Sequence, residues 1–227
     1  MSLPAFFAWV HLWSVIVVTN VGLLYVGAVL FINGLMLIGL IPGKSAALLN
    51  FFVGAMQVVF PTIVILQAAG DIPTILAASG LYLFGFTYLY VGFNQVFDLP
   101  GDGLGWFSLF VTVCAVVFAV LQFTTVGDPV FGVIWLLWAV LWFFFFLLLG
   151  LHMDHLTIFT GWFTAIVAHV TGTIPAIYLL TGKFEPTAGA AWAAAVGGVI
   201  AILVAVVMAQ RARRSTDAAG TPTEVVA

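Results

Sequence analysis

Charged residues are confined to short breaks between long apolar runs and to the C-terminal tail of this chain. Of the 227 residues, 64% are hydrophobic and 6% are charged, against about 25% charged in an ordinary soluble domain. A run of about 20 apolar residues crosses a bilayer as a helix, whereas the strands of a membrane barrel are shorter and alternate in polarity. The pattern therefore predicts an all-α polytopic membrane protein and excludes a soluble one.

Seven spanning helices are predicted from the apolar runs. The breaks between them contain Pro, Gly and Asp, which are typical of turns. The predicted helices span residues 21–41, 46–68, 73–97, 104–125, 130–151, 157–181 and 187–210. These boundaries divide the chain into an apolar N-terminal extension (1–20), a six-helix core (21–181), an additional helix (187–210) and a tail (211–227). The tail is small and polar without periodicity, so we expect it to be disordered.

The basic residues predict the orientation of the helices. Lys44, Arg211, Arg213 and Arg214 fall on one side of the predicted core, and only Lys183 falls on the other. The positive-inside rule then places the C-terminus in the cytoplasm.

The N-terminal extension, residues 1–20, leaves three alternatives open. Its apolar stretch from 3 to 19 is 17 residues long, which is at the lower limit for a crossing. The extension is therefore an eighth spanning helix, a helix lying on the membrane surface, or the product of a start codon placed too early. It has no basic n-region and no small-residue cleavage site, so we predict no cleaved signal peptide.

The predicted spans contain no carboxylate, lysine or arginine. Ion-coupled transporters and proton pumps need such groups at bilayer depth, and a retinal protein needs a lysine inside a span, so both classes are excluded. A membrane haem would need two histidines at matching depth, for which His11 and His169 are the only candidate pair. We interpret His169 as a hydrogen-bonded packing residue and expect no cofactor.

The polar and charged residues between the predicted helices do not form a pattern typical of an enzyme. His152, Asp154 and His155 share one short connection, which is a weak pattern for a metal site, and we interpret them as solvated residues at headgroup level. No nucleophile lies near a base in a hydrolytic motif, and no Gly-rich phosphate loop is present. A formal charge of -3 offers no basic patch for nucleic acid. We therefore expect no metal site, no nucleic-acid partner and no enzymatic activity.

Three tryptophans form a stripe on the fifth predicted helix. Trp135, Trp138 and Trp142 are spaced i, i+3 and i+7, which confines them to one face about 60° wide. The stripe runs about 10 Å along the helix axis, too far for all three rings to lie in one interfacial belt. At least one indole N–H is therefore expected in the membrane interior, against a protein partner or a water-filled path, unless the stripe only packs helices.

Neutral polar and aromatic side chains recur on other predicted helices. They are Phe84 and Tyr88 on the third, Val26, Leu30 and Asn33 on the first core helix, and Asn50 and Gln57 on the second. Aromatic faces with hydroxyl and amide groups suit a small, planar, uncharged solute, while an ion meets an uncompensated desolvation barrier there. The lining predicts passage of a neutral molecule.

Six motifs together resemble the AmiS/UreI family of urea channels and short-chain amide transporters. They are VGLLYVG at residues 21–27, ING at 32–34, NFFVG at 50–54, LFGFTYLY at 83–90, WFSLF at 106–110 and IWLLWAVLW at 134–142. The resemblance covers about residues 21–181. It implies a homohexamer in the bacterial inner membrane, in which each protomer encloses its own pore for urea or short-chain aliphatic amides.

The resemblance also implies which residues line that pore. The family's constriction residues match Val26, Leu30, Phe84, Tyr88, Trp135, Trp138, Leu141 and Trp142. Phe131 stands where the family has a tryptophan near the outer mouth, and Val167 stands where the urea channel has a glutamate.

The differences from the urea channel favour the amide-transporter branch. The outer breaks near 69–72 and 126–129 are short and lack histidine, so we expect no acid gating. The helix over 187–210 has no counterpart in the six-helix urea channel. We expect a passive channel that supplies a cytoplasmic amidase or urease; the alternatives are a transporter of another small neutral solute and a structural membrane protein.

Overall fold

The computed structural model describes the backbone of residues 3–219 and the side chains of residues 19–215. The described part of the chain is helical between short connections and contains no strand. Its elements are α1 (Leu3–Leu37), α2 (Gly43–Gln67), α3 (Ile72–Phe97), α4 (Asp102–Leu121), η1 (Gln122–Val126), α5 (Pro129–Phe145), η2 (Phe146–Gly150), η3 (Asp154–Leu156), α6 (Thr157–Val167), η4 (Ala168–Thr173), α7 (Ile174–Leu180) and α8 (Ala188–Ala219). Seven segments among the described residues are long and apolar enough to cross a membrane, which confirms the predicted fold class.

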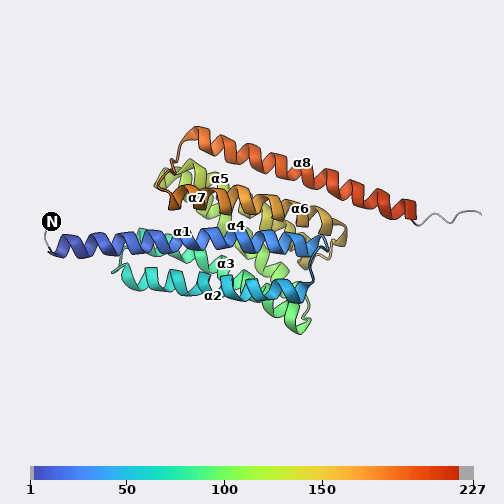
Figure 1. Cartoon of the computed structure of the whole chain (residues 1–227), viewed down its shortest axis with the longest axis horizontal. Coiled ribbons are helices and arrows are strands. Elements are labelled where there is room, and N and C mark those ends of the chain that lie inside the picture. Colours follow the sequence, from blue (N-terminus) through green and yellow to red (C-terminus); the bar gives the residue numbers. More distant parts are fainter. Residues whose placement is uncertain (1–2, 220–227) are drawn as a thin grey trace, which may run out of the picture.

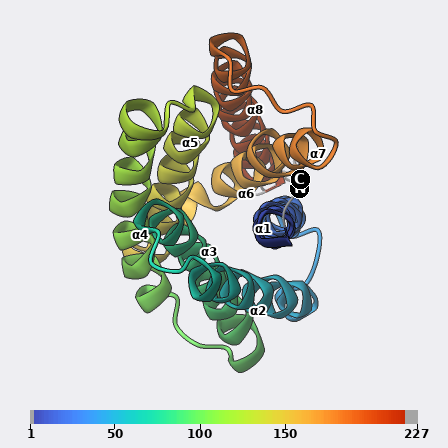
Figure 2. The ribbon, with the colours of Figure 1, turned by 90° about the vertical axis from the view of Figure 1, so that its left-hand side faces the viewer.

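The helices run alongside one another, and six of the seven spans close into a ring (Figures 1 and 2). Each span packs on the next in chain order from α1 to α6, and α6 returns to α1. Helix α8 lies outside this ring, against α5 and α6. The chain thus forms a six-span ring with one additional helix on its outer wall.

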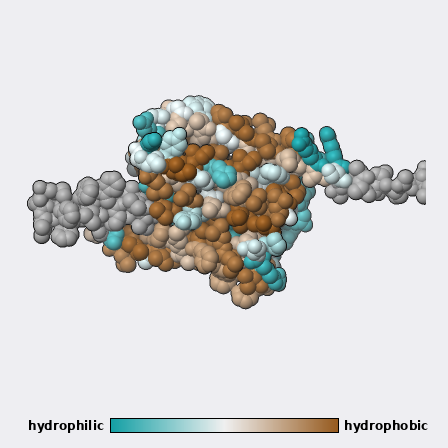
Figure 3. Space-filling model, in the orientation of Figure 1, coloured by the Kyte–Doolittle hydropathy of each residue, from teal (hydrophilic) through white to brown (hydrophobic). Residues whose placement is uncertain are grey.

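Large apolar side chains cover the outside of the ring. Phe52, Leu66 and Trp192 expose 71%, 79% and 72% of their surface. Hydrophobic residues dominate the middle of the face in Figure 3, and hydrophilic ones gather mainly towards its ends. An exterior of this kind is stable only in contact with lipid or with other apolar protein surfaces.

Helices α3 and α5 each begin at an aspartate N-cap. The Asp71 carboxylate accepts a hydrogen bond from the Thr74 N–H (3.0 Å), and the Asp128 carboxylate accepts one from the Phe131 N–H (2.9 Å). Pro129 follows its cap directly and Pro73 is the second residue of α3; in this first turn the missing N–H leaves no intrahelical bond unmade. These caps explain why α3 and α5 begin close to the predicted positions.

Glycines bring α1 and the sixth span into backbone contact. A Cβ added to Gly34 would lie 2.6 Å from the Ala165 nitrogen, and one added to Gly27 would lie 2.7 Å from the Thr173 nitrogen. Small residues that allow close helix approach are the usual means of association in lipid. The contact between α1 and the sixth span therefore leaves no room for a side chain at either glycine.

Two predicted helix ends are wrong. The first core helix ends at Leu37, not at 41, because Gly39 takes a left-handed conformation (φ +79°) that terminates it. The last helix continues to Ala219, beyond the predicted end at 210, because its alanines and arginines are strong helix formers. The expectation of disorder therefore fails for residues 211–219, and residues 220–227 lie outside the described residues.

The sixth span is a single helix in the prediction but contains a π segment, η4, in the structure. Pro175 follows this segment. Proline cannot donate its backbone nitrogen and collides with the carbonyl four residues earlier, and a π-bulge accommodates both effects. Periodicity alone does not reveal such a bulge.

The N-terminal extension continues directly into the first span, since α1 is one helix from Leu3 to Leu37. No break separates the predicted extension from the first predicted core helix. The side chains of residues 1–18 lie outside the described residues, so the alternatives for the extension stay predictions.

Candidate conduction pathway

An aromatic cluster fills the centre of the ring between α3 and α5. The Phe84 ring lies 4.6 Å from Trp138 and 4.7 Å from Trp142, centroid to centroid and edge to face. Trp135 lies 5.9 Å from Phe84 and 4.9 Å from Trp138. All four rings are buried, so the stripe on α5 does face the interior. We call these four residues the aromatic seam.

Two indole N–H groups of α5 are paired inside the protein. Trp138 Nε1 donates to Thr171 Oγ1 (2.9 Å), and Trp142 Nε1 donates to Thr87 Oγ1 (3.3 Å). Of the two partners expected for an indole N–H, a protein group or a water-filled path, the structure shows a protein hydroxyl in both cases. The sequence analysis did not single out either threonine. Buried threonines within spanning helices were the available signal, but no pattern linked them to tryptophans on another helix.

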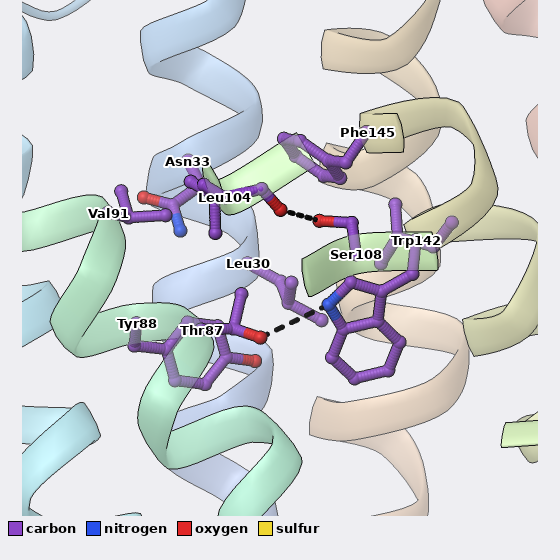
Figure 4. A pocket seen from close by; sticks show the side chains of 10 residues that line it. Leu30, Asn33, Thr87, Tyr88, Val91, Leu104, Ser108, Trp142 and Phe145 are labelled. Carbon is purple, nitrogen blue, oxygen red and sulfur yellow. Dashed lines mark hydrogen bonds between the residues drawn. The ribbon is translucent and has the colours of Figure 1, made fainter. Parts of the chain in front are cut away.

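A cavity of about 20 Å³ lies beside the seam, which is room for about one water molecule. It is lined by Leu30, Asn33, Thr87, Tyr88, Val91, Leu104, Ser108, Leu141, Trp142 and Phe145. These side chains come from α1, α3, α4 and α5 and face one another in Figure 4. Four predicted residues, Leu30, Tyr88, Leu141 and Trp142, belong to this wall. Helix α4 contributes Leu104 and Ser108, which the sequence analysis missed.

The predicted amide side chains bridge helices more than they line the cavity. Asn33 Nδ2 donates to Asn50 Oδ1 (3.0 Å), and Asn50 Nδ2 donates back to Asn33 Oδ1 (2.7 Å). Gln57 Nε2 donates to the Gly22 carbonyl (2.9 Å). Of the three amides, only Asn33 reaches the cavity. Asn50 and Gln57 thus join α2 to α1.

The remaining predicted residues lie near the seam or at the end of the pathway. Val26 is buried in the same core cluster. Phe131 is partly buried at the start of α5, 5.6 Å from the Phe184 ring, away from the other pore candidates. Val167 is fully buried, so this position is apolar where the urea channel is expected to carry a carboxylate.

His169 lies on the outer surface of the ring. Its Nδ1 is 3.2 Å from Thr173 Oγ1, and its ring lies 5.0 Å from that of Phe31. The interpretation as a hydrogen-bonded residue is confirmed, although the side chain is exposed. The His11 side chain lies outside the described residues.

Charged groups gather at the end of the bundle where α2 begins. Lys44 pairs with Asp98 (2.9 Å) and His152 with Asp102 (2.9 Å). No three His, Cys, Asp or Glu side chains among the described residues are placed to hold a metal ion. The histidines of the 152–155 connection therefore do not gather with a carboxylate into a ligand set.

A second, wider hollow of about 570 Å³ lies between the ring and α8. Its walls include Val170 and Ile174 on one side and Ala190, Ala194 and Gly197 on the other. It shares no residue with the small cavity. The additional helix thus encloses space outside the ring.

The ring of spans and its buried, uncharged seam define the class of polytopic helical membrane proteins. The sequence matches the AmiS/UreI family of transporters over residues 18–183. The chain belongs to that family. Helix α8 lies beyond the matched residues.

Individual relatives fall into two groups. The transporter protein AmiS2 of Rhodococcus erythropolis is 57% identical over 178 residues, covering 78% of this chain and 86% of that protein. An amidate substrates transporter protein of Mycolicibacterium smegmatis is 52% identical over 192 residues, covering 85% and 90%. The acid-activated urea channel of Helicobacter pylori is 36% identical over 184 residues, covering 68% and 93%.

Solved structures of the Helicobacter pylori urea channel share the fold. Its crystal structure has a TM-score of 0.65 at 31% identity and covers 73% of this chain and 99% of the channel. Its closed state, determined by electron cryomicroscopy, has a TM-score of 0.67 at 32% identity, covering 74% and 100%. The whole urea channel thus corresponds to about three quarters of this chain, which leaves room for an added segment such as α8.

Proposed function

We propose that the protein is a passive channel for small neutral amides and urea. The observation that carries this proposal is the aromatic seam, which crosses the ring without a charged side chain and has Trp138 and Trp142 paired to hydroxyls. Because the seam has no carboxylate, lysine or arginine, it offers no site for a driving ion. A neutral planar solute can stack on the rings and replace part of its hydration with hydroxyl contacts.

Short-chain amides are the proposed principal substrates. Two relatives above 50% identity carry amide-transport names or the AmiS name, and the urea channel is more distant. The buried Val167 supports the same preference, because an apolar residue there offers urea no acceptor. Such a channel would supply a cytoplasmic amidase or urease.

The proposed setting is the bacterial inner membrane, with the C-terminus in the cytoplasm. Lys44 and the three arginines of α8 lie on this side, and Lys183 lies on the other, so the Lys and Arg count favours the cytoplasm for this side. Arg213 donates to the His155 carbonyl (3.2 Å), which places the two elements on the same side. The family resemblance supports a homohexamer with one pore in each protomer.

Stopped-flow swelling of proteoliposomes tests the proposal. Purified protein should raise the permeability to acetamide, formamide and urea, and a protonophore or sodium ionophore should leave the rates unchanged. Accumulation of acetamide against its gradient that collapses with a protonophore would show a coupled transporter. Permeability equal to that of empty liposomes for every solute would indicate a structural protein, and selective passage of an unrelated neutral solute would indicate another substrate.

A further inference from the structure

The hydrogen-bonding capacity of the small cavity is almost fully used within the protein. Thr87 Oγ1 donates to the Leu83 carbonyl (2.6 Å) and accepts from Trp142. Asn33 is held by two hydrogen bonds to Asn50. Thr87 and Asn33 therefore keep their hydrogen-bond partners within the protein whether or not a solute is present. Two other hydroxyls in the cavity wall, those of Tyr88 and Ser108, have unused hydrogen-bonding capacity.

The Tyr88 hydroxyl is a donor without a partner. It is buried and makes no hydrogen bond, although an unpaired buried hydroxyl costs stability. In Figure 4 the hydroxyl end of the Tyr88 ring is turned towards the side on which Trp142 lies. This phenol can give its proton to an acceptor that enters the cavity.

The Ser108 hydroxyl already donates its proton to a group within the protein, so its oxygen is left as an acceptor. Ser108 Oγ donates to the Leu104 carbonyl at 2.7 Å, as Figure 4 shows, and no described group donates to it. A hydroxyl has one proton and two lone pairs, so this oxygen can only accept from a solute. The side chain is buried.

The rest of the wall is apolar. Leu30, Val91, Leu104, Leu141 and Phe145 complete the lining. A polar group turned towards them would be desolvated without compensation. A methyl or ethyl group would pack there.

From this inventory we infer that the cavity is a selectivity site for primary amides with a short alkyl group, read by Tyr88 and Ser108. The carbonyl oxygen accepts from Tyr88 Oη, one N–H donates to Ser108 Oγ, and the alkyl group packs against the leucines. Urea satisfies the same two hydroxyls, but its second amino group then faces the apolar wall unpaired. The inference rests on the proposed function and adds a reason for amides to pass faster than urea.

The small size of the cavity indicates at which step of permeation the Tyr88 and Ser108 hydroxyls act. About 20 Å³ holds one water, so an amide enters only by displacing side chains and leaving its hydration behind. The cavity is thus a desolvation barrier, and hydrogen bonds made there lower that barrier. Losing one of them slows permeation.

Two single variants test the assignment in proteoliposomes. Tyr88→Phe and Ser108→Ala each remove one hydroxyl with little change in shape. Each should lower acetamide permeability about three- to tenfold and reduce the acetamide-to-urea ratio towards one. Tyr82→Phe and Ser79→Ala are matched controls, because both hydroxyls lie on α3 outside the cavity, bonded to Thr62 and to the Ile75 carbonyl. The controls should keep the wild-type ratio.

The outcomes separate this inference from the proposed function. Wild-type protein that passes neither solute overturns both. Wild-type protein that passes both, with an acetamide-to-urea ratio unchanged in the two cavity variants, overturns the selectivity site alone. Size-exclusion chromatography identifies a variant that does not fold, and the other variant then decides the question.

Discussion

Two contacts within the ring are built in opposite ways. Between α1 and the sixth span, glycines bring the backbones together, so that a Cβ at Gly34 would lie 2.6 Å from the Ala165 nitrogen. Between α3 and α5, large rings fill the space, and a water-sized cavity lies beside them. A backbone contact has no side chain that can move, whereas a ring can turn about its χ angles. We therefore expect the glycine contact between α1 and the sixth span to stay fixed. We expect the ring contact between α3 and α5 to be the one that opens if a solute passes.

Under the proposed function, the comparison indicates how a solute would pass. The ring of Phe84 packs edge to face on Trp138 and Trp142, and the cavity beside them is about 20 Å³. If a solute passes there, we expect side chains of the seam to move while the helices stay in place. We expect the glycine contact between α1 and the sixth span to keep the ring closed during that movement.

The largest effect is expected from breaking the fixed contact. Gly34→Leu places a side chain where the Ala165 backbone lies at 2.6 Å from a Cβ, and overpacking of this kind costs about 1–3 kcal/mol or more. We expect the folded fraction on size-exclusion chromatography to fall sharply. Gly189→Leu is the matched control, because a Cβ there meets only Thr187, at 3.9 Å. A normal elution profile for Gly34→Leu would show that the contact is not fixed.

A smaller effect is expected from Thr171→Val, which removes the acceptor of the Trp138 N–H. A buried donor left unpaired costs about 1–3 kcal/mol, so the variant should melt at a lower temperature and conduct acetamide at an altered rate. Thr164→Val is the control, because that buried hydroxyl bonds only to the Thr160 carbonyl. In a Trp138→Phe background the effect of Thr171→Val should largely disappear. An undiminished effect there would show that the threonine acts through another group.

The smallest effect is expected from pH. Hydrogen bonds from the Thr74 side chain and backbone lower the pKa of Asp71 below its ordinary value. A lowered folded-state pKa means that the contribution of this cap is present above the unfolded-state pKa and is lost only as pH falls below about 4. No histidine lies in the outer breaks. Acetamide flux should therefore stay constant from pH 8 to 5 outside the vesicle, and a several-fold rise on acidification would reveal an acid gate.

The sequence was sufficient to predict features that depend on one helix at a time. Periodicity placed Trp135, Trp138 and Trp142 on one face, and the structure confirms that this face is buried. Features that depend on two helices were out of reach. Nothing in the sequence shows that Thr171 lies beside Trp138, because that contact is set by the packing of α5 against the sixth span. Ser108 was missed for the same reason, since its place in the cavity wall depends on how α4 packs against α3 and α5.

The measurement that tests the account most directly replaces Trp138 and Trp142 by alanine, singly, and compares acetamide with glycerol permeability in proteoliposomes. If the seam is the pore wall, each alanine widens the path, so the acetamide-to-glycerol ratio falls, while Trp138→Phe and Trp142→Phe keep the ratio closer to that of the wild type because a flat ring is retained. If the rings only pack helices, each alanine leaves a cavity costing about 3–5 kcal/mol and the oligomer is lost on native gels. Alanine variants that assemble normally and keep the wild-type acetamide rate and selectivity would contradict the account.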